Sequence, residues 1–249
     1  MTTAVTIQDV IDQLGEIIAE CQQANSRLGY FPAMYRKVTV RIKEGVENGR
    51  FQDPDRLEHL DVVFAQRYLD AYRQYRQRQQ PTRSWAYAFD RTQEPQHTVF
   101  QHLLLGMNAH INLDLGIAAA EVCQNCDLAP LKEDFFAINE VLAGLLDEVQ
   151  DNLNQSSPLF QHIDSLGGRV DETLGNFSLR RARRAAWRKA IALHNLPPTD
   201  HPDAIYRYDR STSRLAQIIC PTGGVAQLLS SNISRHELEE PHKIISILL

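Results

Sequence analysis

A histidine and a carboxylate interrupt the apolar segment that runs from Leu103 to Leu115. At helical spacing, His110 and Asp114 fall on the same stripe as large apolar residues, so both side chains are predicted to face the core. An isolated buried carboxylate costs several kcal/mol, so Asp114 needs a partner. His110 is four residues away, and this offset lets both side chains reach one atom, as helical metal sites require. The alternative is a buried hydrogen bond that only fixes helix packing.

Asp61 is a second polar residue in an apolar helical stripe. Its neighbours on the stripe include Leu57, Leu60, Phe64 and Tyr68, which places the carboxylate inside the protein. We predict that it converges with His110 and Asp114 as a third ligand. Three protein ligands suit a catalytic divalent metal such as zinc, and a carboxylate-rich set also suits iron. The alternative is that Asp61 only accepts hydrogen bonds from a tyrosine or a neighbouring helix.

Other residues could support chemistry near such a centre. Asn108 and Asn139 are amides that could orient a substrate, so they are candidate catalytic residues. A basic run from Arg180 to Lys189 covers most of one helix surface. It is either a solvated face or a site for a phosphate, a carboxylate or an acidic lipid head group.

The elements that must position these residues are helices. Apolar residues recur at helical spacing over 5–21, with Thr6 as the expected N-cap, over 32–46 and over 54–75. The helix that carries His110 is predicted to begin near Pro95. Further helices are predicted over 131–153, 179–194 and 204–220, and alternating strand patterns are nearly absent. The sequence therefore predicts an all-α protein, a multi-helix bundle in a single domain over residues 1–249.

Composition narrows the classes of function. The chain of 249 residues has a net charge of -5, which argues against nucleic-acid binding through overall charge. No apolar run reaches the roughly 18 residues that a membrane span needs, and the first residues do not resemble a signal peptide. Four cysteines give no disulfide framework. We expect a cytoplasmic protein with no membrane span, and the sequence leaves its oligomeric state open.

Three stretches carry a resemblance to a known family. They are the segments 60–68 (LDVVFAQRY), 85–89 (WAYAF) and 106–115 (GMNAHINLDL). In these the chain resembles a bacterial family of helical proteins, the domain of unknown function 5995. The resemblance covers the whole chain and implies a helical fold, but it brings no activity with it.

A more distant resemblance concerns the segment from Leu105 to Leu115. Leu105-Gly106, His110 and Asp114-Leu115 are similar to the helix of zinc-dependent phospholipase C enzymes that supplies a histidine and a bridging aspartate. The histidine expected shortly after this pair is missing, because the segment 116–120 is apolar. The resemblance therefore implies a shared helical scaffold more strongly than a shared reaction.

Two functions remain open at this point. The first is a metal-dependent, hydrolase-like enzyme that acts on a small or lipid-like substrate, with Asp61, His110 and Asp114 as metal ligands. The second is a metal-free helical protein that binds a hydrophobic small molecule or a protein partner. In that case an aromatic group is expected to line the pocket: Tyr68, Tyr72, Trp85 and Phe89.

Overall fold

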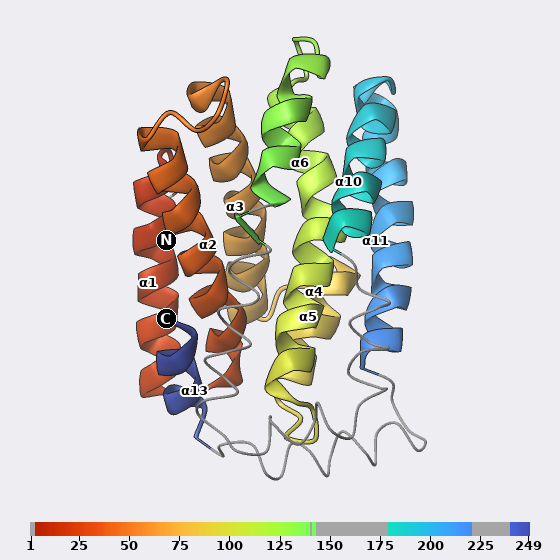
Figure 1. The fold of residues 1–249 in the computed structure, drawn as a ribbon. Coiled ribbons are helices and arrows are strands. Elements are labelled where there is room, and N and C mark those ends of the chain that lie inside the picture. The colour runs from red at the N-terminus through yellow and green to blue at the C-terminus, as the bar shows by residue number, and fades with distance from the viewer. Residues whose placement is uncertain (1–2, 140, 143–178, 221–239) are drawn as a thin grey trace, which may run out of the picture.

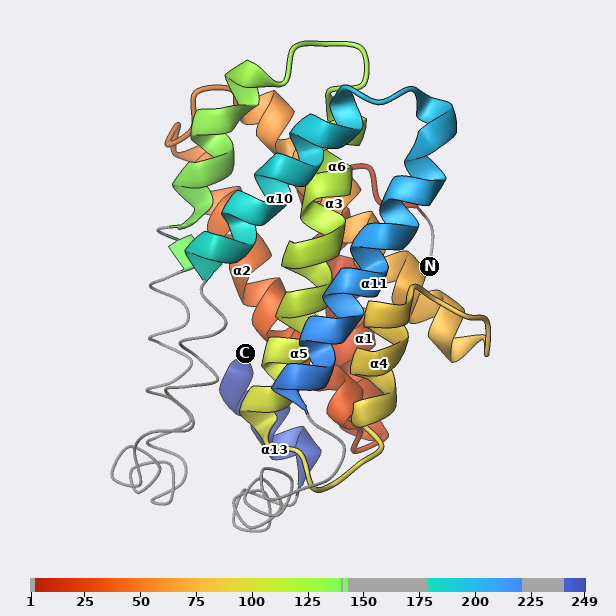
Figure 2. The same ribbon diagram turned by 90° about the vertical axis from the view of Figure 1, so that its right-hand side faces the viewer.

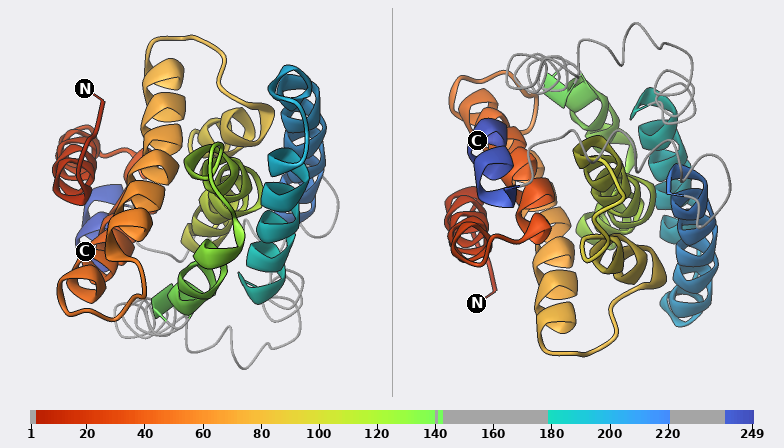
Figure 3. Two further views of the ribbon diagram at one scale, coloured as in Figure 1. Left: turned by 90° about the horizontal axis from the view of Figure 1, so that it is seen from above. Right: turned by 90° about the horizontal axis from the view of Figure 1, so that it is seen from below.

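The computed structural model describes residues 3–139, 141–142, 179–220 and 240–249. Over these ranges the regular elements are all helices, and no strand occurs among them. The protein is all-α, as the hydrophobic periodicity predicts. Seen from the end, the helices lie in layers, with α1 and α13 outermost, α2 and α3 next, then α5 and α6, and α10 and α11 on the far side (Figure 3).

The first three long helices lie where the helical periodicity predicts them, with ends that differ from the predicted ones by up to two residues. They are α1 (Ile7–Gln23), α2 (Tyr30–Glu47) and α3 (Pro54–Arg76), with the 3₁₀ turn η1 (Arg27–Gly29) before α2. Thr6 caps α1 in a reciprocal capping box with Asp9. Asp53 caps α3 by accepting a hydrogen bond from the backbone N–H of Arg56.

The central helix is continuous from Val99 to Val122 but changes its winding midway. It consists of α5 (Val99–Ala109), the π-helical turn η2 (His110–Asp114) and α6 (Leu115–Val122). The predicted start near Pro95 is wrong by four residues. Thr98 forms the N-cap, because its side chain and that of Gln101 satisfy each other's backbone N–H groups.

The central helix is also the one described helix that is long and apolar enough, by composition, to cross a membrane. Its most apolar 18-residue window is entirely buried inside the protein. That burial is what the core helix of a packed bundle requires, and Figure 1 shows α5 and α6 flanked on both sides by other helices.

The remaining helices complete the bundle. They are α4 (Arg83–Arg91), the 3₁₀ turn η3 (Ala129–Leu131), helical residues over 132–139 and 141–142, α10 (Leu179–His194), the 3₁₀ turn η4 (Pro198–Asp200), α11 (His201–Ile219) and α13 (Pro241–Leu248). The predicted helix over 131–153 is therefore present over 132–139 and 141–142, and its other residues beyond 139 lie outside the described ranges. Helices α4 and α13 have no counterpart among the predicted elements.

The core runs between the layers. One cluster of buried apolar side chains includes residues from every long helix, from Ile7 in α1 to Leu248 in α13. A smaller cluster joins the central helix, α10 and α11 through Leu113, Ile117, Leu193 and Ala204. Helix α10 crosses α6 at close range, as Figure 2 shows from the side. This packing holds α2, α3, the central helix and α10 around a common interior space.

Candidate functional site

The π-helical turn places His110 and Asp114 in the middle of the central helix. The backbone N–H of Leu115 donates to the carbonyl of His110, five residues back, so the turn is wider than an α-helical one. Such turns are rare and occur frequently at functional sites. His110 Nδ1 lies 3.4 Å from Asp114 Oδ2, and both side chains are buried.

Asp114 is held chiefly by residues from other helices. Its Oδ2 accepts a hydrogen bond of 2.7 Å from Trp85 Nε1 of α4, and its Oδ1 accepts one of 3.1 Å from Arg67 Nε of α3. The carboxylate is thus compensated by a guanidinium and an indole as well as by the longer contact to His110. It ties α3 and α4 to the central helix.

His110 sits among aromatic rings. Its ring stacks on Phe64 with 3.5 Å between centroids and lies edge-on to Tyr35 at 4.6 Å. Burial lowers the pKa of His110 below its usual value, although the hydrogen bond and charge of Asp114 act in the opposite direction. The imidazole is therefore neutral at pH 7, and its Nε2 has no hydrogen-bond partner among the described residues.

Asp61 is also inside the protein, as its apolar stripe predicts. Its side chain is 3% exposed, and Oδ2 has no hydrogen-bond partner within the described part of the chain. Burial, with a smaller contribution from the charge of Glu58, raises the pKa of Asp61 to about 7. At neutral pH this carboxyl group is close to half protonated, so it is able both to donate and to accept a hydrogen bond.

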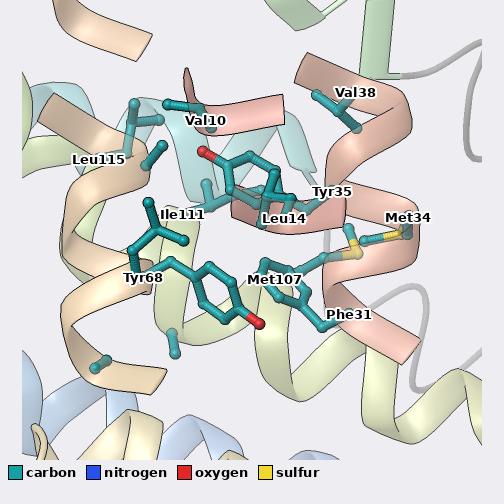
Figure 4. Packing of buried hydrophobic residues seen from close by; sticks show 14 of the residues in the cluster. Val10, Leu14, Phe31, Met34, Tyr35, Val38, Tyr68, Met107, Ile111 and Leu115 are labelled. Atoms are coloured by element: carbon teal, nitrogen blue, oxygen red, sulfur yellow. The ribbon is translucent and has the colours of Figure 1, made fainter. Parts of the chain in front are cut away.

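Asp61 and His110 line one cavity between α2, α3, the central helix and α10. Its volume, counted as the space open to the centre of a water-sized sphere, is about 60 Å³. That is room for about four to six water molecules, and so for a short aliphatic chain or a single ring. Figure 4 shows part of its wall, where Phe31, Met34, Tyr35 and Val38 of α2 pack with side chains of the central helix. The remaining lining residues are Ile42, Leu57, Leu60, Phe64, Met107, Ile111, Leu115, Ile138, Leu142 and Arg183.

Most of this lining is apolar, and each of its hydrogen-bonding side chains carries an unpartnered atom. In addition to Asp61 Oδ2 and His110 Nε2, the Tyr35 hydroxyl and Arg183 Nε are buried without a partner among the described residues. A buried polar group left unpaired costs about 1–3 kcal/mol, so several at one cavity call for an explanation.

The three predicted metal ligands are brought near one another but not to one point. Asp61 and His110 both line the cavity, whereas Asp114 lies behind His110 and is engaged by Arg67 and Trp85. Within the described ranges, no three His, Cys, Asp or Glu side chains are grouped closely enough to hold a metal ion. The ligand roles of Asp61, His110 and Asp114 stay a prediction.

The two candidate asparagines lie outside the cavity lining. Asn108 is fully buried, donates to the carbonyl of Thr212 on α11 at 3.0 Å, and accepts from Asn112 Nδ2 at 3.1 Å. Asn139 follows the lining residue Ile138, and its Oδ1 is buried without a partner among the described residues. Their catalytic roles also stay a prediction, and the contacts of Asn108 join α11 to the central helix.

Sequence reasoning missed two features of the site. Arg183 reads as part of an exposed basic run, yet it is 2% exposed and lines the cavity. Its position four residues before Trp187, on the apolar side of α10, is the signal that could have found it. The aromatic group Tyr68, Tyr72, Trp85 and Phe89 packs in the core and does not line this cavity.

The fold and the cavity define an all-α protein with a small internal cavity. Comparison with known proteins adds one assignment: the chain belongs to a family of unknown function (DUF5995), whose model matches residues 7–222. No curated protein and no solved structure matches the chain. The resemblance to zinc-dependent phospholipase C therefore finds no support.

Proposed function

We propose that this protein binds a small, largely apolar molecule that carries at least one hydrogen-bonding group. The observation that carries the proposal is the cavity itself, an apolar space lined by four side chains with buried, unpartnered polar atoms. Small-molecule sites combine an apolar wall with a few polar groups that fix orientation. A ligand with a donor or acceptor would relieve the cost of those unpaired groups.

The polar groups of the cavity suit both directions of hydrogen bonding. Neutral His110 offers either an acceptor or a donor, according to its tautomer, and Asp61 offers both because its pKa is about 7. Burial raises the pKa of Tyr35 well above its usual value, so its hydroxyl stays protonated. The oxygen atoms of an alcohol, a carbonyl compound or a carboxylic acid therefore find matching partners in the cavity.

A metal-dependent hydrolase, the other function that the sequence suggests, needs three ligands around one point. The described side chains do not supply such a group, and Asp114 already has two other partners. Binding of a small molecule needs only the cavity and its polar atoms, so we favour the metal-free function.

Titration calorimetry with 1-butanol, whose five non-hydrogen atoms match the size of the cavity, tests the proposal. Wild-type protein is expected to bind one molecule per chain. Ile111→Phe places a larger side chain in the cavity wall and is expected to weaken binding at least tenfold, roughly what losing a few apolar contacts removes. The matched control is Ile17→Phe, which enlarges a fully buried residue of α1 that does not line the cavity.

Two outcomes contradict the proposal. One is the absence of saturable binding by the wild-type protein. The other is an equal effect of Ile111→Phe and Ile17→Phe on the dissociation constant, which would show that the ligand does not bind in this cavity.

A further inference from the structure

We propose that the ligand of this cavity is an anion, a short-chain carboxylic acid whose carboxylate is bound by Arg183. The inference rests on the proposed function and narrows it to a class of ligand. Arg183 differs from its basic neighbours on α10 in the exposure of its side chain. Arg180, Arg184 and Arg188 are exposed, whereas Arg183 is 2% exposed and reaches the cavity.

The partners that the structure gives Arg183 are neutral. Its Nη2 donates to the carbonyl of Phe135, and its guanidinium lies over the Phe135 ring at 4.7 Å from the centroid. Its Nε is buried with no partner among the described residues, and none of the ion pairs they form includes it. A buried cation is strongly disfavoured unless a charge of opposite sign accompanies it.

Asp61 is the one carboxylate among the described lining residues, and it does not pair with Arg183. No ion pair among the described residues joins the two side chains, and Asp61 Oδ2 has no hydrogen-bond partner among them. By contrast, Arg67 is matched by Asp114 at 3.1 Å. Burial lowers the pKa of Arg183 to about 9, so the guanidinium remains charged at pH 7. Among the described residues, the guanidinium of Arg183 therefore has no paired carboxylate.

A carboxylate supplies that anion and fits the rest of the space. A guanidinium binds a carboxylate through two parallel hydrogen bonds, which is the strongest pairing available to its free donors. Most of the other side chains that line the cavity, Ile138, Leu142 and Leu115 among them, are apolar and suit an alkyl tail. One guanidinium in a cavity of this size favours a single anionic group on a short chain.

Calorimetry at pH 7.5 with ligands that share one alkyl chain tests the inference. Butanoate is expected to bind wild-type protein roughly tenfold or more tightly than 1-butanol, because a charge-assisted pair replaces a neutral contact. Arg183→Met keeps the length of the side chain and is expected to remove this preference while 1-butanol still binds. Arg183→Lys keeps the charge and should retain part of the preference. The matched control is Arg184→Met, an exposed neighbour on the same helix.

The outcomes separate the inference from the proposed function. Equal affinity of the wild-type protein for butanoate and 1-butanol, or an unchanged preference in Arg183→Met, overturns the inference and leaves the binding function standing. Binding of neither ligand overturns both. Preference for butylamine would assign the charged contact to Asp61 instead and also overturns the inference. Butyl phosphate at equal concentration shows whether the head group is a carboxylate or a phosphate, and tighter binding of the phosphate contradicts the carboxylate.

Discussion

At the scale of single residues, the site is a network in which Asp114 is the common partner. Sequence reasoning assigns His110 as the residue that compensates this carboxylate. In the structure, Trp85 and Arg67 make the shorter contacts, at 2.7 and 3.1 Å, and His110 lies at 3.4 Å. The histidine therefore depends on Asp114 for its orientation more than Asp114 depends on the histidine.

This order of dependence predicts different effects of two substitutions. Asp114→Ala leaves the guanidinium of Arg67 and the buried indole N–H of Trp85 unpaired. It should lower the free energy of unfolding by about 3–4 kcal/mol. This is the lower part of the range for breaking a buried ion pair, because Arg67 is partly exposed. His110→Ala removes ring contacts but leaves Asp114 with two donors, so its effect should be about 1–3 kcal/mol. Urea unfolding of the two variants measures the difference. A larger effect of His110→Ala would show that the histidine is the main partner.

At the scale of elements, close helix contacts and caps from distant residues place the site. The N-terminus of α4, which carries Trp85, is capped by Asp209 of α11, which accepts from the backbone N–H groups of Arg83 and Ser84 at 2.8 and 2.9 Å. The local cap residue, Thr82, makes no such bond. Gly116 lets α10 approach α6, because a Cβ there would lie 2.6 Å from the carbonyl oxygen of Ala186.

The contact at Gly116 can be tested with one methyl group. Gly116→Ala must push the backbone of α10 away and is expected to lower the free energy of unfolding by about 1–3 kcal/mol, as overpacking does. The matched control is Gly15→Ala in α1, where the nearest atom to the new Cβ is 3.7 Å away at the end of Arg36. There the better helix propensity of alanine should stabilise by about 0.5–1 kcal/mol. Urea denaturation gives both values, and a neutral Gly116→Ala would contradict the close approach of these helices.

At the scale of the whole molecule, buried titratable groups set the response to pH. Burial lowers the pKa of His97, His102 and His110, that of His102 to about 3. In the unfolded chain a histidine titrates near 6.5, so below that pH the unfolded state takes up protons that the folded state does not. Asp61 acts in the opposite direction between pH 7 and its unfolded value of 3.8, because its folded pKa is about 7. The three histidines outweigh the one aspartate, so the free energy of unfolding should fall as the pH drops below 6.5.

His102 provides the test of this balance, because both of its ring nitrogens are buried without a partner among the described residues. In the wild-type protein, His102 lowers the free energy of unfolding by up to about 1.4 kcal/mol for each pH unit below 6.5. His102→Leu removes this effect. The variant should therefore lose less stability than wild type between pH 6.5 and pH 4.5 in urea unfolding experiments. His59→Leu, at an exposed position of α3, is the control for the substitution itself. An unchanged pH dependence in His102→Leu would contradict the burial of this imidazole.

The sequence by itself determined the features that depend on neighbours along the chain. Helical periodicity predicts the all-α class, and the caps at Thr6 and Asp53 lie where their side chains reach the first free N–H groups. The burial of Asp61, His110 and Asp114 also follows from their places in apolar stripes, because a helix carries its whole stripe into the core.

Only the tertiary structure decided which partners these residues meet. Arg67 lies 47 residues from Asp114 in sequence, and no local pattern relates the two. Arg183 lies on the apolar side of α10, but only the packing of the helices decides that it meets the Phe135 carbonyl and the cavity. The side chain that caps α4 is Asp209, which lies 125 residues beyond Ser84. Because this cap is distant in sequence, the residues near α4 carry only weak signals of a helix start. Periodicity specifies which face of a helix is buried, whereas the pairing of polar groups depends on which helices pack together, and that is a property of the whole fold.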